Sequence, residues 1–297
     1  MRWSNYHVVS SLQEVLERLS ELDGKGRVVA GGTDLIVRLK EIDAPPKPLT
    51  LLDLTRIEEM QGIAQVGDDI RIGAATSIAE IAASPLVRSK ARALAQGAGW
   101  LGSPQIRSVA TVGGNVVNAL PAGDTTIPLV ALAARARVLS ADGERVLPVE
   151  ELFRGVAESA IDPSREVVTE FLLKAGAPPT NASAMTRMAK RKAFTLPVLS
   201  VAVSIELDAH TERFQTARIV AAPVAPVPWR ARRAEEALVY SEISGESLEG
   251  AAALAREDAN PSNSLRAGAA YRKDMVAVLV RRALRDALEQ LEKAPDD

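Results

Sequence analysis

Apolar residues recur at helical and strand spacing in the first part of the chain, with turn-forming residues between the segments. Leucine and valine residues follow a helical period over residues 12–22, and Ser11 and Glu14 have the form of a capping box, S-x-x-E, at the start of this segment. Apolar runs at 27–30 and 49–54 predict strands, and the segment 33–40 between them predicts a short helix. This part of the chain is therefore expected to form a small α/β unit, with Gly31-Gly32 in the turn from strand to helix.

Further along, paired apolar segments with a polar or glycine-containing turn between them predict β-hairpins. The pairs are 63–66 with 70–72, 137–140 with 145–149, and 198–207 with 214–221. Residues 166–173 predict a further strand. Helices are predicted after Ser77, from Ser84 to about Gln96, from an Asp124 cap to Ala134, at Ala231–Tyr240 and at Ala269–Glu292. Hairpins separated by short helices favour an α+β fold over a doubly wound parallel sheet.

A stretch rich in Gly, Pro and Ala, Lys174–Asn181, is the best candidate for a linker. It divides the 297 residues into a first region over 1–175 and a second region over 180–292. Two regions agree with the usual size of a protein domain. Within the first region we expect two lobes, about 1–55 and 56–175.

The composition excludes several classes of protein. A net charge of −2 and an aromatic fraction of 3% argue against a nucleic-acid binder. The absence of cysteine excludes disulfides, thiol catalysis and iron–sulfur clusters held by this chain, and with 2 histidines a metal site is not expected. No apolar run approaches the ~18 residues that span a bilayer, and the N-terminus lacks the features of a signal peptide. We therefore expect a cytoplasmic protein without a transmembrane segment.

One glycine-rich stretch matches a dinucleotide-binding motif but stands in the wrong context. Gly97–Gly102 has the form G-x-G-x-x-G, yet a predicted helix precedes it. The dinucleotide fingerprint follows a strand and opens a helix. We therefore expect a plain loop at this place.

Two other glycine pairs are better placed to bind a ligand. Val29–Leu35 (VAGGTDL) joins a predicted strand to a helix, and Thr111–Asn115 (TVGGN) has the same character with hydroxyl and amide side chains added. Glycine lets the backbone approach a ligand closely, and a helix N-terminus offers unpaired N–H groups to an anion. Either motif alone also fits a tight turn with no ligand. Together, the two segments suit the diphosphate of a dinucleotide cofactor.

In this order, the motifs resemble the FAD-binding medium subunit of the molybdenum hydroxylases, a family that includes carbon monoxide dehydrogenase, xanthine dehydrogenase and aromatic hydroxylases. The resemblance extends from near the N-terminus to the last helix. It is carried by VAGGTDL (Val29–Leu35), IGAATS (Ile72–Ser77), QIRSVATVGGNVVNALPAGD (Gln105–Asp124) and YRKDM (Tyr271–Met275). It implies that the first region is a two-lobed FAD-binding domain of the vanillyl-alcohol-oxidase (PCMH) type, and that the second region is a smaller α+β C-terminal domain.

The resemblance also implies which residues bind FAD. The two glycine segments would hold the pyrophosphate, Leu101 would contact the flavin, and Asp124 would bind the sugar-phosphate region, although a helix cap explains Asp124 equally well. Val168 would offer a backbone contact, and Arg187 stands where a lysine is common, with a surface arginine as the alternative. In full, the expected FAD-binding residues are Val29, Ala30, Gly31, Gly32, Thr33, Asp34, Leu35, Leu101, Thr111, Gly113, Gly114, Asn115, Asp124, Val168 and Arg187.

The function that the resemblance implies is electron transfer without a substrate-oxidising centre in this chain. No catalytic and no metal-binding residue is expected here. The molybdenum cofactor would sit on a large partner subunit and [2Fe–2S] clusters on a small one, in a heterotrimer. FAD in this chain would take electrons from those clusters and pass them to an external acceptor. Two alternatives stay open, a stand-alone FAD-dependent oxidase or dehydrogenase and a non-catalytic nucleotide-binding assembly protein.

Overall fold

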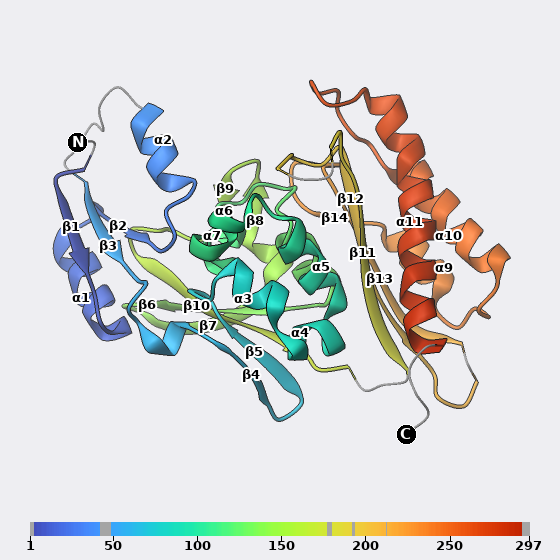
Figure 1. Cartoon of the computed structure of the whole chain (residues 1–297), viewed down its shortest axis with the longest axis horizontal. Coiled ribbons are helices and arrows are strands. Elements are labelled where there is room, and N and C mark those ends of the chain that lie inside the picture. The colour runs from blue at the N-terminus through green and yellow to red at the C-terminus, as the bar shows by residue number, and fades with distance from the viewer. Residues whose placement is uncertain (1–2, 42–48, 177–179, 192–193, 212, 293–297) are drawn as a thin grey trace.

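Three sheets follow one another along the molecule, with short helices between the second and the third (Figure 1). The structure, a computed structural model of the chain, describes residues 3–41, 49–176, 180–191, 194–211 and 213–292. Within these residues the strands form a three-stranded, a five-stranded and a four-stranded sheet and one two-stranded pair. The mixture of antiparallel hairpins and helices confirms the expected α+β class.

The first sheet is small and parallel, and helices cover both of its faces. Across the sheet its strands are β1 (Asn5–Val8), β3 (Thr50–Asp53) and β2 (Gly26–Val29). Its helices are α1 (Leu12–Leu22) and α2 (Leu35–Glu41). Successive residues of a strand point to opposite faces, so Leu52 shares a buried cluster with Val15 of α1, whereas Leu51 packs with Leu39 of α2. The turn between β2 and α2 is thereby held against the rest of the chain.

The second sheet is antiparallel and supports a layer of short helices on one face. Its strands, in order, are β4 (Ile63–Val66), β5 (Asp69–Gly73), β10 (Glu166–Lys174), β6 (Arg135–Ser140) and β7 (Gly143–Pro148). The helices are α3 (Ile78–Ala83), α4 (Pro85–Lys90), α5 (Arg92–Trp100), α6 (Pro104–Val109), α7 (Val112–Val117) and α8 (Thr126–Ala131). Short 3-10 turns at Glu58–Met60 and Val149–Leu152 and the pair β8 (Phe153–Gly155) and β9 (Glu158–Ser159) complete this part. Apolar side chains from the sheet and the helices form one continuous core.

The third sheet is buried on both faces. Its antiparallel strands are β11 (Asn181–Met188), β12 (Leu199–Leu207), β13 (Phe214–Ala222) and β14 (Trp229–Arg230). On one face lie α9 (Arg232–Leu238), α10 (Gly245–Asp258) and α11 (Ala269–Glu292). Alternate residues of β12 face opposite sides: Val201 and Val203 join the core under these helices, and Ala202 joins the core of the second sheet. The third sheet therefore packs directly against the helical layer of the second.

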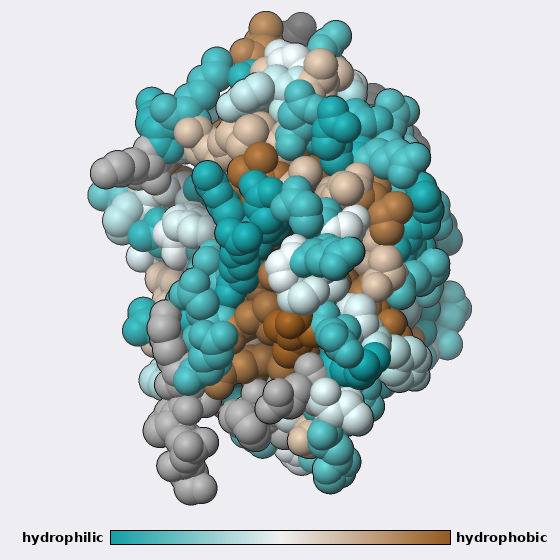
Figure 2. All heavy atoms as spheres, turned by 90° about the vertical axis from the view of Figure 1, so that its right-hand side faces the viewer, coloured by the Kyte–Doolittle hydropathy of each residue, from teal (hydrophilic) through white to brown (hydrophobic). Residues whose placement is uncertain are grey.

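The outer surface of α9, α10 and α11 is mainly polar. Figure 2 shows hydrophilic side chains over most of this side of the molecule, with apolar side chains gathered in a hollow. α11 is amphipathic, with Val276, Leu279, Val280, Ala283, Leu284 and Ala287 buried. Over the part of the chain that the structure describes, no helix is both long and apolar enough to cross a membrane.

The glycine-rich stretch after Gln96 is helical, so the loop expected there is wrong. The single helix predicted from Ser84 is broken at Ala91 into α4 and α5, and α5 continues through Gly97 to Trp100. Position 97 is glycine because the helix packs closely against another segment, not because the chain turns there. A Cβ placed on Gly97 would lie 2.0 Å from the carbonyl oxygen of Asp124, so the helix approaches that segment as only glycine allows.

Asp124 does not cap a helix, contrary to the expectation from its position. α8 begins one residue later, with Thr125 at its N-cap position, and ends at Ala131 rather than Ala134. The positive φ of 54° at Ala133 takes the backbone out of the helix. The side chain of Asp124 is instead buried, with 6% of the residue exposed.

Several elements were not expected from the sequence, among them the strands β1 and β11 and the helices α6, α7 and α10. All four residues of β1 are exposed, so no apolar alternation marks that strand. The buried face of α10 consists of Leu248, Ala251, Ala252 and Ala255, small residues that a search for leucine and valine periodicity passes over. β11 begins at Asn181, the last residue of the predicted linker, of which residues 177–179 lie outside the described residues.

The close approach at Gly97 predicts a difference between two neighbouring glycines of α5. Gly97→Ala should lower the melting temperature by about 3–8 °C, because the new methyl group forces α5 away from the Asp124 carbonyl. Gly99 is the matched control, since a Cβ there meets nothing within 4 Å. Gly99→Ala should leave the melting temperature unchanged or raise it slightly, because alanine favours a helix. Equal melting temperatures for the two variants in a circular dichroism scan would contradict this packing.

Candidate functional site

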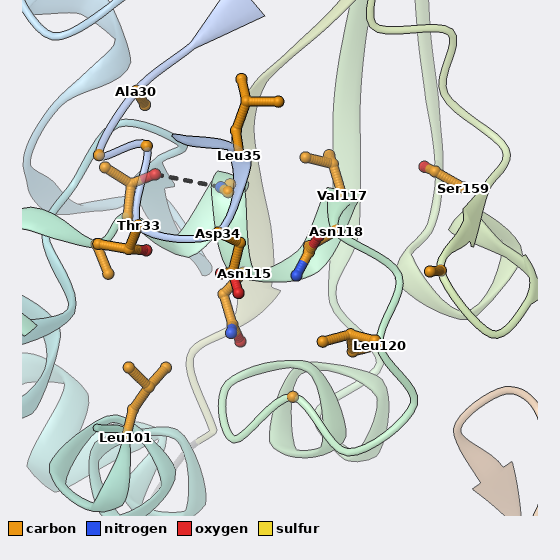
Figure 3. A pocket seen from close by; sticks show the side chains of 18 of the residues that line it. Ala30, Thr33, Asp34, Leu35, Leu101, Asn115, Val117, Asn118, Leu120 and Ser159 are labelled. Carbon is orange, nitrogen blue, oxygen red and sulfur yellow. Dashed lines mark hydrogen bonds between the residues drawn. The ribbon is translucent and has the colours of Figure 1, made fainter. Parts of the chain in front are cut away.

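A cavity of about 1280 Å³ opens between the first sheet, the helical layer and the third sheet. It is larger than the ~300–1,000 Å³ of most small-molecule sites, and so suits an extended ligand. Figure 3 shows Thr33, Leu101 and Asn115, which come from three different segments, around one open space. The wall near the third sheet includes Phe194, Thr195, Leu196 and Pro197.

The turn after β2 forms one wall, and its two glycines have different roles. Gly32 has a φ of 65°, a left-handed conformation that glycine adopts without strain. Gly31 has no such φ, but a Cβ on it would lie 2.1 Å from the carbonyl oxygen of Val109. The turn therefore packs directly on the end of α6, and this contact places the backbone of Val29–Leu35 at the cavity.

The first turn of α7, which directly follows the segment that Gly31 touches, forms a second part of the wall. The Thr111 hydroxyl caps this helix by accepting a hydrogen bond from the Gly114 N–H at 3.2 Å. Gly113 lies against the residue that follows β5, because a Cβ on it would be 2.7 Å from the Ala74 carbonyl oxygen. Gly114 is exposed, and a Cβ on it would meet only the Thr111 hydroxyl oxygen at 3.1 Å. The bare backbone of Gly114 thus faces open space in the cavity.

A buried carboxyl group lies at the next segment of the wall. Burial raises the pKa of Asp124 from 3.8 to about 6, and the positive charge of Arg187 opposes this rise. The Arg187 Nε lies 3.7 Å from Asp124 Oδ1, too far for a hydrogen bond. Both of these atoms are buried without a hydrogen-bond partner among the described residues. Such an unsatisfied carboxylate oxygen at a cavity wall is available to a ligand hydroxyl.

Positive charge is also present where β2 and α2 face the cavity. Arg27 and Arg38 both line it, and within the described residues neither forms an ion pair. Burial, and then the nearby charge of Arg38, lower the pKa of Arg27. Two guanidinium groups that repel each other favour an anionic or aromatic ligand between them and the glycine turn.

The structure brings together all of the expected FAD-binding residues except one. The residues that line the cavity are Val29, Ala30, Gly31, Gly32, Thr33, Asp34, Leu35, Leu101, Thr111, Gly113, Gly114, Asn115, Asp124 and Val168. Arg187 does not line it, and it is not a surface arginine either, since 5% of its side chain is exposed. Whether the lining residues contact FAD stays a prediction.

Sequence reasoning missed lining residues of two kinds. Arg27 and Arg38 flank the first glycine pair, and their position there was a signal that could have found them. Phe194–Pro197 and Arg266 come from the second region of the chain, and no local pattern links them to the glycine segments. Only the packing of the third sheet places them at the cavity.

Comparisons with known proteins agree with this geometry. Residues 2–173 match the family described as the FAD binding domain in molybdopterin dehydrogenase, and residues 184–287 match the CO dehydrogenase flavoprotein C-terminal domain. The chain is 28% identical to the FAD-subunit of nicotinate dehydrogenase from Eubacterium barkeri, over 89% of each chain. It is also 28% identical to the carbon monoxide dehydrogenase medium chain of Hydrogenophaga pseudoflava, over 95% of this chain and 96% of that one. A solved structure of carbon monoxide dehydrogenase from the same organism superposes with a TM-score of 0.89 over 98% of each chain.

The raised pKa of Asp124 predicts a pH-dependent loss of stability in the chain without FAD. An unfolded Asp124 ionises near 3.8 and the folded one near 6, so across this range the folded state holds a proton that the unfolded state has lost. Stability therefore falls as the pH rises, by about 3 kcal/mol for a shift of about two pKa units. Asp124→Asn should remove the part of this fall in stability that comes from the Asp124 carboxyl group. We expect urea unfolding to show a steeper fall for the original protein than for the variant between about pH 4 and 7.5; parallel curves would contradict the burial of an ionisable Asp124.

Proposed function

The chain belongs to the family of FAD-binding domains found in molybdopterin dehydrogenases, and from this we propose that it is the electron-transfer subunit of a multi-subunit molybdenum hydroxylase. In this proposal its FAD takes electrons from iron–sulfur clusters of a small partner subunit. The molybdenum centre lies on a large partner subunit, and an external acceptor removes the electrons. The observation that carries the proposal is that the two glycine segments, distant in sequence, line one cavity of dinucleotide size.

The residues at the cavity fit FAD. At Gly114 a side chain would fill space that the structure leaves open, and Gly32 holds the turn in a left-handed backbone conformation that favours glycine. A pyrophosphate needs this kind of close backbone approach and N–H groups that point toward it. The unsatisfied Oδ1 of Asp124 fits a ribityl or ribose hydroxyl group. FAD, when bound, supplies a centre that accepts electrons singly and passes them on, and the protein supplies its position and electrostatic surroundings.

Each part of the cavity then has a task. The backbone of the two glycine segments binds the pyrophosphate, and the charges of Arg27 and Arg38 balance negative charge or stack on the adenine. Leu101 and Leu120, which also line the cavity, would provide apolar surface for the flavin and exclude water from it. Asp124 orients a cofactor hydroxyl by accepting its hydrogen bond.

Relay of electrons fits the side chains at the cavity better than oxidation of an organic substrate. Neither of the two histidines lies there: His7 is on β1, and His210 is in the turn between β12 and β13. An oxidase that abstracts a proton from its substrate commonly uses a histidine or a comparable base beside the flavin. Because the sequence contains no cysteine, thiolate-bound iron–sulfur clusters belong on another chain.

A first prediction of the proposal concerns FAD binding. The full chain should bind about one FAD, non-covalently, and Gly114→Val should weaken binding more than about tenfold because the side chain enters the cavity. Gly250→Val is the matched control: Gly250 is also exposed, in α10, where a Cβ would meet nothing within 4 Å, and it does not line the cavity. Titration followed by flavin fluorescence measures the FAD affinity of both variants. Equal affinities for the two variants would place FAD elsewhere.

A second prediction concerns the partners. The purified chain with FAD should mediate reduction of a dye by a chemical reductant, but should show no substrate-driven activity until the molybdenum and iron–sulfur subunits are added. The test is reconstitution from separately purified subunits. Turnover of an aldehyde, an alcohol or an N-heterocycle by this chain alone would instead favour the stand-alone oxidase. A correctly folded chain that binds no flavin at all would favour the assembly protein.

A further inference from the structure

A regular set of hydrogen bonds joins the helical layer to the third sheet, between α5 and the free edge of β11. The Ala93 N–H donates to the Ser183 hydroxyl at 3.2 Å, and the Met185 N–H donates to the Gln96 side-chain oxygen at 2.8 Å. Arg187 donates to the Trp100 carbonyl oxygen at 3.0 Å. We call these three contacts the α5–β11 seam.

The spacing of the three contacts follows from the side-chain periods of a strand and of a helix. Its strand residues lie two apart, on one side of β11, and its helix residues lie three and four apart, on one face of α5. β11 is an edge strand among the described residues, so the N–H of Met185 has no neighbouring strand on that side, and Gln96 satisfies it. The last contact of the seam, at Arg187, is the one that reaches the cavity.

Arg187 contacts three separate segments that border the cavity, although it does not line the cavity itself. It donates to the carbonyl oxygen of Trp100, next to Leu101, and to the carbonyl oxygen of Thr195, which lines the cavity. Its Nε lies 3.7 Å from Asp124 Oδ1. One buried guanidinium group therefore ties the end of α5, the segment before α8 and the loop before β12 to one another.

We propose that Arg187 is a positioning residue for FAD: it fixes these three walls and so holds Asp124 where its free oxygen can accept a hydrogen bond from a cofactor hydroxyl. The inference rests on the proposed function of the chain. It differs from the role that the sequence resemblance implies, in which Arg187 contacts the cofactor directly. The distance of 3.7 Å leaves Asp124 Oδ1 without a hydrogen bond from the described residues, so that the oxygen keeps its acceptor capacity for the ligand.

The charges around Asp124 determine in which direction the loss of Arg187 would shift the pKa of Asp124. Burial raises the pKa of Asp124, and Arg187 is the charged group that lowers it. α5 approaches Asp124 with Gly97, and α7 lies beside its segment with Asn115, neither of which is charged. Arg154, Arg191 and Arg266 also line the cavity, and none of them is among the groups that shift the pKa of Asp124. Without the Arg187 charge, the pKa of Asp124 rises further, and near neutral pH the carboxyl is protonated and accepts more weakly.

The test measures the affinity of the full chain for FAD by flavin fluorescence between about pH 5 and 8.5. In the original protein the affinity should rise with pH through a midpoint near the pKa of Asp124. Arg187→Met should move the midpoint upward by about one pH unit or more and weaken binding at pH ~7 by about tenfold. Arg187→Lys keeps the charge, so its midpoint should stay close to that of the original protein. Asp124→Asn should abolish the dependence of FAD affinity on pH over this range.

Gln96→Ala is the structural control, because it breaks the middle contact of the seam and leaves the charge beside Asp124 in place. It should lower the melting temperature without moving the pH midpoint. An unchanged midpoint in Arg187→Met, or an equal shift in Gln96→Ala, would overturn the positioning role. If Arg187→Met does not fold, Arg187→Lys decides: a midpoint displaced by a pH unit despite the retained charge overturns the proposal. An original protein that binds no FAD refutes the proposed function instead.

Discussion

The shape of the cavity depends on three places where one backbone touches another so closely that no side chain fits between them. A Cβ would lie 2.1 Å from the Val109 carbonyl oxygen at Gly31, 2.7 Å from the Ala74 carbonyl oxygen at Gly113, and 2.0 Å from the Asp124 carbonyl oxygen at Gly97. The first contact holds the turn after β2, the second holds α7 against the second sheet, and the third brings α5 to the segment that carries Asp124. Real Cβ atoms do not approach a carbonyl oxygen this closely, so each contact requires glycine.

These contacts bring groups of complementary chemistry to one space. Two stretches of bare backbone line the cavity, two arginines lie near one of them, and a buried carboxyl group lies beside the other. A ligand that carries a diphosphate, hydroxyl groups and a flat apolar ring has a use for each of them. The same packing joins the helical layer to the third sheet, because α5 touches Asp124 on one side and β11 on the other. Binding at the cavity and the seating of the third sheet are therefore physically linked through Arg187.

Local signals in the sequence were sufficient for much of the fold. The hairpin predicted from 63–66 and 70–72 and the helix predicted after Ser77 were correct, because the residues that fix β4–β5 and α3 are neighbours in the chain. The role of Gly97 was not predictable in this way. A glycine in a helix that packs on a distant carbonyl oxygen has the same local sequence as a glycine in a loop. For Asp124, a position before an apolar run indicated a helix cap, and tertiary packing buried the side chain instead.

In the candidate site, too, residues contiguous in the sequence were found from it, and residues brought in by tertiary packing were not. Both glycine segments were found from sequence because each is contiguous, whereas Phe194–Pro197 reaches the cavity only through the packing of the third sheet. The proposed boundaries of the two regions and the contacts of individual residues with FAD stay predictions.

The central claim is that FAD lies in this cavity with its pyrophosphate between the two glycine segments. A crystal structure of the chain with FAD tests it most directly: density for the pyrophosphate against the backbone of Gly32 and Gly114 is the expected result, and FAD bound at any other surface would contradict the account.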